Sequence, residues 1–212
     1  MPVTSTSLTE RRKAATRTDI ARTAAALFVA RGVRDTRAED IARAAGVAPR
    51  TFYRYFATKE EAVAPLFAAG ARLWVDATRA APAALPLPEA LVHGTREALS
   101  PEDPANAESL EWVRSLLRLA DDNPVLRTVW NDAYHQSEVA LAGALAERAG
   151  EDPERRPLPL GLRLAAGTAA TAVRVAVETW AAGDAPADGP QGPAALAARC
   201  IESLSTSPWS IT

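Results

Sequence analysis

Apolar residues recur along the chain at spacings of three and four positions, which is the period of an amphipathic α-helix. No segment shows the strict alternation of apolar and polar residues that a half-buried β-strand requires. Prolines interrupt the pattern at 82–88, 101–104, 153–159 and 186–193, and the segments between them have helical length. The pattern therefore predicts an all-α protein of about nine or ten helices.

The first predicted helix runs from Ser7 to Arg31. Ser7 and Glu10 have the spacing of a capping box, and Gly32 supplies the signal that ends the helix. This helix also carries a basic face, which is either simply solvated or reaches a phosphate or the minor groove of DNA. The basic residues are Arg11, Arg12, Lys13 and Arg17.

Two short helices follow around a glycine. Thr36 and Glu39 have the spacing of a capping box, so Thr36 is the expected N-cap of the second helix, and Gly46 ends it. Ala48 is the expected N-cap of the third helix, because Pro49 suits the first helical position. Two short helices around a turn that contains glycine are typical of a helix-turn-helix.

The third helix has an apolar and a polar side. Phe52 and Phe56 are four residues apart and are expected to point inward, which leaves five residues outside or on the flank. Arginine pairs with guanine through two hydrogen bonds, and hydroxyl groups donate to base edges or phosphates. These chemistries make the outward residues a candidate DNA-reading face, with Lys59 as an added positive charge. The five are Arg50, Thr51, Tyr53, Arg54 and Tyr55.

The segment 46–60, with the sequence GVAPRTFYRYFATKE, resembles the recognition segment of the TetR family of transcriptional regulators. Phe28-x-x-x-Gly32 and Thr36-x-x-x-x-Ile41-Ala42-x-x-Ala45-Gly46 match the spacing of that family, so the resemblance covers about residues 14–61. It implies phosphate contacts from Thr36, Tyr53, Tyr55 and Lys59. It also implies base-facing roles for Arg50, Thr51 and Arg54.

The chain departs from the family pattern at two positions. Ala48 stands where many members have serine, so this cap lacks a side-chain hydrogen bond. Arg37 stands where a second threonine is common, and it is a candidate phosphate ligand in its own right. Both departures leave the fold intact but change the expected DNA contacts.

The chain divides into a helix-turn-helix domain over residues 1–58 and a helical ligand-sensing and dimerisation domain over 59–212. We expect a long helix from Lys59 to Ala80, in which Pro65 causes either a functional kink or a harmless bend. The resemblance implies that the last two helices, 158–182 and 194–205, form the interface of a homodimer.

Aromatic residues of the middle helices, 108–120 and 124–149, are candidates for a ligand pocket or for an ordinary core. Their apolar character favours an apolar or aromatic effector. Arg174 and Glu178, four residues apart, are expected to form a weak surface pair. The candidate pocket residues are Trp112, Leu116, Trp130 and Tyr134.

Charge is distributed unevenly along the chain. Residues 1–60 contain 12 Lys and Arg against 6 Asp and Glu, whereas the remainder contains 12 against 20. A basic head on an acidic body suits a protein that holds DNA with one part only. The single cysteine, Cys200, excludes an internal disulfide, and no His and Cys spacing suggests a metal site. We expect no cofactor, no membrane span and a cytoplasmic location.

Together these features predict a repressor that binds a palindromic operator in double-stranded DNA as a homodimer and is released by an unidentified small molecule. An activator has the same sequence signals. A basic protein that coats DNA without reading its sequence is a second alternative. An enzyme is not expected, because the chain has no nucleophile elbow, phosphate-binding glycine loop or metal-ligand set.

Overall fold

The computed structural model describes residues 8–154 and 156–205, and every regular element in this part of the chain is a helix. The all-α prediction is confirmed, and so is the expected number of helices. The predicted cap at Ser7 lies outside the described residues. The elements are α1 (Leu8–Arg31), α2 (Ala38–Ala44), α3 (Pro49–Tyr55), the 3₁₀ helix η1 (Glu60–Val63), α4 (Ala64–Ala80), α5 (Leu87–Leu99), α6 (Pro104–Ala120), α7 (Pro124–Arg148), α8 (Leu160–Ala182) and α9 (Pro193–Ser205).

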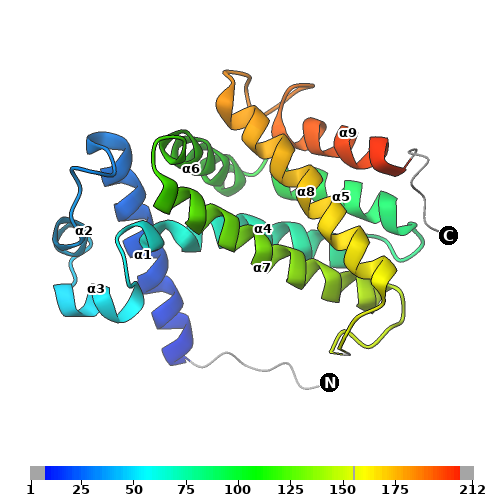
Figure 1. Ribbon diagram of the computed structural model, residues 1–212, viewed down its shortest axis with the longest axis horizontal. Coiled ribbons are helices and arrows are strands. Elements are labelled where there is room, and N and C mark those ends of the chain that lie inside the picture. Colours follow the sequence, from blue (N-terminus) through cyan, green and yellow to red (C-terminus); the bar gives the residue numbers. More distant parts are fainter. Residues whose placement is uncertain (1–7, 155, 206–212) are drawn as a thin grey trace.

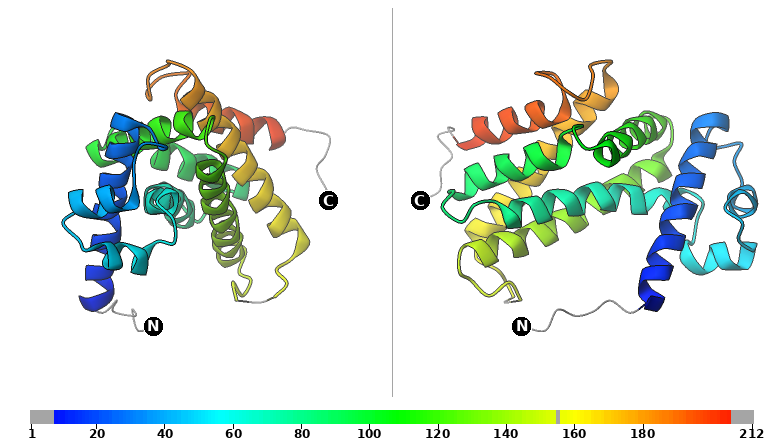
Figure 2. Two further views of the ribbon diagram at one scale, coloured as in Figure 1. Left: turned by 60° about the vertical axis from the view of Figure 1, so that its left-hand side comes forward. Right: turned by 180° about the vertical axis from the view of Figure 1, so that it is seen from behind.

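Helices α1, α2 and α3 form a head at one end of the molecule, and α4 leads from it into a bundle of the remaining helices (Figure 1). In this body α4 packs against α5 and α7, while α8 packs against α6, α7 and α9. The two views of Figure 2 show the same arrangement from other directions. Helix α1 also contacts α4 and α6, so the head is joined to the body through side chains as well as through the chain itself.

The turn between α2 and α3 has the predicted form. Gly46 adopts φ +68°, a left-handed conformation that glycine adopts without steric cost. Its N–H donates to Arg43 O at 3.2 Å, and Val47 N–H donates to Ala42 O at 2.9 Å, which together end α2 in a Schellman motif. Pro49 then opens α3 at its first position, as predicted. The turn thereby sets the angle between the two helices.

The predicted cap of α2 is wrong by one residue. Arg37 occupies the N-cap position, and its backbone N–H donates to the Asp40 carboxylate at 3.3 Å. Thr36 is fully buried, and its hydroxyl donates to Gly32 O at 2.9 Å. The threonine therefore closes the loop onto the end of α1, because its hydroxyl finds a nearby backbone acceptor there.

The single helix expected from Lys59 to Ala80, with a proline inside it, is also wrong. The segment forms η1 and then α4, and Pro65 lies in the first turn of α4, where a missing N–H costs no helical hydrogen bond. The start of η1 is closed by two hydrogen bonds. Thr58 Oγ1 accepts a hydrogen bond from Glu61 N at 3.1 Å, and the Glu61 carboxylate accepts from Ala57 N at 3.0 Å.

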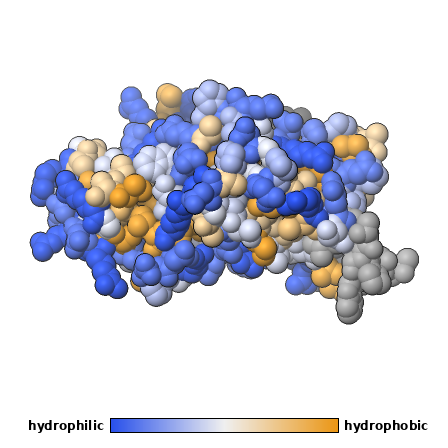
Figure 3. All heavy atoms as spheres, turned by 90° about the horizontal axis from the view of Figure 1, so that it is seen from above, coloured by the Kyte–Doolittle hydropathy of each residue, from blue (hydrophilic) through white to orange (hydrophobic). Residues whose placement is uncertain are grey.

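Helix α8 is apolar on two sides: one side is buried against the bundle, and another carries the exposed residues Leu160, Leu164 and Val175. Within the described residues, α8 is the one helix that is long and apolar enough to cross a membrane, judged by length and composition alone. Its buried residues, among them Ala169, Val173 and Trp180, face the neighbouring helices. Figure 3 shows a face of the molecule on which hydrophilic residues separate a few apolar patches.

Candidate nucleic-acid interface and internal cavity

Helix α3 presents a polar face to solvent. Phe52 is fully buried and Phe56 is 3% exposed, so the two aromatic rings fix the inner side of the helix. Arg50, Tyr53 and Arg54 are exposed and share one face, because residues three and four apart lie above one another on a helix. Thr51 and Tyr55 are half-buried on the flanks. The predicted division into inward and outward residues of α3 is confirmed.

The exposed residues of α3 are only partly engaged with the protein. The guanidinium of Arg50 forms no ion pair or hydrogen bond with any described residue, so it is ready for an external acceptor. The Arg54 guanidinium lies over the Tyr55 ring, 5.3 Å from its centroid. Tyr53 donates its hydroxyl to Glu39 at 3.2 Å, and its pKa is raised by burial and by that bond. A phosphate contact from Tyr53 therefore requires an exchange of partner.

Two basic residues of α1 extend this face. The Arg17 guanidinium carbon lies 5.5 Å from the centroid of the Phe56 ring, at the end of α3. Lys13 lies one turn earlier on the same side of α1, and its hydrogen bond to Glu10 at 2.8 Å raises its pKa. The sequence showed the basic character of α1 but not its position, because only the fold brings Arg17 next to Phe56.

Lys59 does not face outward, although the sequence predicted a phosphate contact. Its ammonium donates to Val33 O at 2.6 Å and to Thr36 O at 2.8 Å, and it holds the loop between α1 and α2 against η1. Because these carbonyls occupy its donors, a phosphate contact from Lys59 requires an exchange of partner, as it does for Tyr53. The Thr36 side chain is fully buried, so its hydroxyl does not lie on the exposed face of the head. Arg37 remains exposed at the start of α2, where it can reach an anion.

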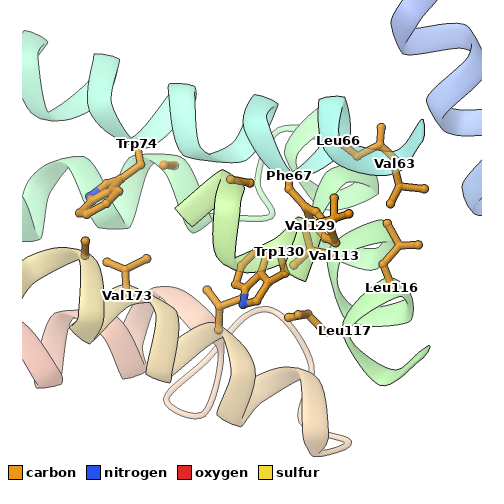
Figure 4. Close-up of a cluster of buried hydrophobic side chains, with 14 of the residues drawn as sticks. Val63, Leu66, Phe67, Trp74, Val113, Leu116, Leu117, Val129, Trp130 and Val173 are labelled. Atoms are coloured by element: carbon orange, nitrogen blue, oxygen red, sulfur yellow. The ribbon is translucent and has the colours of Figure 1, made fainter. Parts of the chain in front are cut away.

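The body contains a cavity between α4, α5, α6, α7 and α8. Its free volume is about 60 Å³, and Figure 4 shows Trp74 and Val173 at one side with Phe67 and Trp130 at the other. Trp130 and Tyr134 line this cavity, as predicted. Two of the four candidate pocket residues therefore lie together at the cavity, because they are one turn apart on the same face of α7.

The other two candidates lie elsewhere. Leu116 is fully buried in the core, and Trp112 donates its indole N–H to Glu108 at 3.2 Å on the outer side of α6. The face of α6 that reaches the cavity carries Leu110 and Val113 instead. Sequence reasoning favoured the largest residues of α6, but the neighbours of α6 decide which of its faces turns inward.

Arg174 and Glu178 belong to a network rather than to a weak surface pair. Glu178 accepts from Arg174 at 3.1 Å and from Trp130 Nε1 at 2.7 Å, and Arg127 lies 3.5 Å from the same carboxylate. Tyr134 donates to Ala170 O, and burial raises the pKa of its hydroxyl. The polar atoms of Trp130 and Tyr134 therefore bind residues of α8, and only the rings of these two residues line the cavity.

Within the described residues, no group of three or more His, Cys, Asp or Glu side chains is arranged to hold a metal ion. The chemistry of the head is instead that of a positively charged surface. An exposed basic helix, held by a glycine turn against a second short helix, defines a helix-turn-helix DNA-binding protein. In this class the second of the two helices enters the major groove.

Comparison with known proteins identifies the family. Residues 20–64 match the family model described as bacterial regulatory proteins, tetR family, and residues 86–200 match the model of the MftR C-terminal domain. The chain belongs to the TetR family of transcriptional regulators. This family consists of DNA-binding regulators rather than enzymes.

One curated relative is the HTH-type transcriptional regulator TcmR of Streptomyces glaucescens, which is 31% identical over 147 residues. The match covers 68% of this chain and 65% of that protein, so the chain spans less than two thirds of the relative. Two solved structures have the same fold. FadR of Thermus thermophilus, in complex with lauroyl-CoA, has a TM-score of 0.55 and 24% identity, with 92% of this chain and 96% of that chain covered. FadR of Bacillus halodurans has a TM-score of 0.57 and 23% identity, with the same coverage.

Proposed function

We propose that this protein is a cytoplasmic repressor that binds a palindromic operator as a homodimer and is released by a small molecule. Residues 1–58 are the DNA-binding domain, and residues 59–212 are the sensing and dimerisation domain. The observation that carries the proposal is the exposed face of Arg50, Tyr53 and Arg54 on a helix fixed from behind by Phe52.

The proposed DNA contacts are of two kinds, contacts to base edges and contacts to phosphates. Arg50 lies in the first turn of α3, the part of a recognition helix that reaches base edges, and it suits bidentate donation to guanine. Thr51 beside it can meet a base edge or a thymine methyl group. Arg37, Tyr55 and the basic residues of α1 lie around this point and hold phosphates, which sets register without reading sequence.

The dimer interface is proposed on α8 and α9. This side of the body carries a groove of about 920 Å³ lined by both helices. Leu160, Leu164 and Val175 line it and are 75%, 48% and 44% exposed, which leaves apolar surface for a second copy to cover. A two-fold pairing through one such face is isologous, and it would place two recognition helices about 34–36 Å apart, or a multiple of that distance.

Release follows from the position of α4. This helix lines the cavity with Phe67 and Trp74 and is joined directly to the head through η1. A ligand that favours a different position of α4 would shift the dimer towards a conformation in which the distance between its two heads no longer matches the operator. Only one head could then bind its half-site. The T. thermophilus relative holds lauroyl-CoA, but the cavity of this chain is narrow and calls for a different ligand.

The test of DNA reading is selection of bound duplexes from a random pool by the purified protein at a stated salt concentration. Enrichment of one inverted repeat is the expected result. Binding without enrichment would favour the alternative of a basic protein that coats DNA. No binding by a folded protein would overturn the proposal.

The test of the dimer face is Leu164→Glu, followed by sedimentation equilibrium. Burial of two charges at a two-fold interface should weaken the dimer at least about tenfold. Val125→Glu is the matched control, since Val125 is 51% exposed on α7 and does not line the groove. Equal association of both variants would place the interface elsewhere.

A further inference from the structure

The cavity in the body is chemically unusual in two respects. Its lining, which consists wholly of described residues, contains no Asp, Glu, Lys, Arg or His. It also contains an unused hydrogen-bond donor, because the indole N–H of Trp74 has no acceptor within hydrogen-bond distance among the described residues. Trp74 is 3% exposed, so bulk water does not satisfy this donor.

The other polar side chains of the lining differ from Trp74 in being partnered or partly exposed. Asn106 and Ser109 on α6 are half-buried, and Asn106 donates to Glu97 O at 3.4 Å. Trp130 donates to Glu178 at 2.7 Å, and Tyr134 donates to Ala170 O on α8. Ser137 donates to Tyr134 O at 2.7 Å, within α7. Trp74 stands on α4, at the opposite side of the cavity from Trp130 (Figure 4). Among the described lining residues, Trp74 is the one with a fully buried polar atom that has no partner.

An indole nitrogen donates a hydrogen bond but cannot accept one. A buried donor without a partner is unfavourable, and an occupant that supplies an oxygen acceptor removes that cost. A charged occupant would lose its hydration without gaining a counter-charge from the lining, which strongly disfavours ions. These two constraints restrict the ligand more narrowly than its apolar character alone.

We propose that the effector is an uncharged, largely apolar molecule with a hydrogen-bond acceptor that binds the indole N–H of Trp74. This inference rests on the proposed function, in which the cavity is the sensing site. Gly70 and Ala71 leave little bulk along α4, and the partly exposed Leu73 joins the cavity to the surface. A ligand of one or two rings requires the cavity to widen beyond its free volume of about 60 Å³.

The experiment compares three bicyclic probes of similar size with the full-length protein: indane, 1-indanone and indane-1-carboxylate. Indane has no acceptor, 1-indanone adds one neutral carbonyl, and the carboxylate adds a charge. Titrations followed by the indole region of ¹H–¹⁵N spectra give a dissociation constant for each probe and report the Trp74 N–H directly. We expect 1-indanone to bind about five- to tenfold more tightly than indane, and the carboxylate to bind most weakly.

Trp74→Phe removes the donor and keeps an aromatic ring. In this variant 1-indanone should lose its advantage and bind like indane, while the affinity for indane stays within about twofold. Trp112→Phe is the matched control, because Trp112 is an indole outside the cavity that donates to Glu108. It should leave all three affinities unchanged. Should Trp74→Phe fail to fold, the shift of one indole resonance with 1-indanone but not with indane in the native protein still decides the question.

Equal affinities for indane and 1-indanone would refute the claim that the ligand needs a hydrogen-bond acceptor. Tight binding of the carboxylate would refute the claim that the ligand is uncharged. Binding of none of the three would overturn the cavity as a site for molecules of this kind. These results do not depend on DNA. Failure of the duplex selection would therefore refute the proposed regulator, whereas failure of the probe titration would refute only the inferred ligand chemistry.

Discussion

Arginine serves opposite purposes in the head and in the body. On α3 the guanidinium groups of Arg50 and Arg54 point to solvent without a carboxylate partner. In the body, Arg118 donates to Ala181 O at 2.8 Å and to Gly183 O at 2.7 Å. Arg148 donates to Ala81 O at 2.6 Å and to Pro82 O at 2.9 Å. The same side chain is left free for an external anion in one region and closes a helix end or a loop in the other.

The difference shows that a count of basic residues does not locate a DNA-binding surface. Carbonyls at helix ends and in loops lack internal partners, and a nearby arginine satisfies them. In this chain three arginines of the body, Arg114, Arg118 and Arg148, are used in this way. Lys59, at the junction of head and body, is a comparable case, because its ammonium donates to the carbonyls of Val33 and Thr36.

Of the arginine variants that test this difference between head and body, Arg148→Met should have the largest effect on stability. The change removes at least two charge-assisted hydrogen bonds to the loop between α4 and α5, and we expect the free energy of unfolding to fall by about 3 kcal/mol. Urea denaturation measures it. Arg72→Met is the control, because Arg72 is exposed on α4, and it should change stability by less than about 0.5 kcal/mol. Similar losses for both variants would show that Arg148 is no more structural than a surface residue.

Arg50→Ala should affect DNA binding instead of stability. Loss of a bidentate base contact should weaken binding to the selected operator by about thirtyfold, within the range of 1–3 kcal/mol per contact, with stability nearly unchanged. Fluorescence anisotropy at fixed salt on the operator and on a scrambled duplex measures this. Arg50→Lys separates charge from geometry, since it keeps the charge but loses the planar fork. An equal loss on both duplexes would rule out base reading by Arg50.

Lys59→Met tests the comparable case at the junction of head and body. We expect the free energy of unfolding to fall by about 1.5 kcal/mol, because the carbonyls of Val33 and Thr36 lose their donor. The slope of log K against log salt for DNA binding should not change, since the ammonium does not meet a phosphate. Arg37→Met provides the contrast, because Arg37 is exposed and is a proposed phosphate ligand, and it should reduce the slope without loss of stability. A reduced slope with normal stability for Lys59→Met would restore the original phosphate assignment.

The accuracy of the sequence predictions follows the range of the interactions behind them. The turn at Gly46, the start of α3 at Pro49 and the inward phenylalanines depend on near neighbours along the chain, and all three were predictable. The partners of Lys59 were not, because its ammonium donates to carbonyls that lie 26 and 23 residues earlier in the chain. Thr36 is an exception to this rule, since its hydroxyl donates to Gly32 O, only four residues away.

The cavity shows the same limit in the body. Periodicity predicted the helices but not which face of each turns inward, so of the candidate residues Trp130 and Tyr134 line the cavity, whereas Trp112 lies outside it. Trp74, the one described lining residue with a fully buried polar atom that has no partner, was not singled out, because burial and lack of an acceptor are properties of the assembled bundle. A tryptophan one turn beyond an interior glycine on α4 was the only signal that the sequence offered.

The smallest expected effect concerns the basic face of α1. Arg17→Met should weaken DNA binding about threefold on the operator and on a scrambled duplex alike, and reduce the salt slope by about one unit, because it removes one phosphate contact. Arg22→Met is the control, since Arg22 lies 3.9 Å from Glu108 on α6 and faces the body. An unchanged slope for Arg17→Met would confine the DNA footprint to α2 and α3. A loss specific to the operator would instead show that α1 reads sequence, which a phosphate contact cannot do.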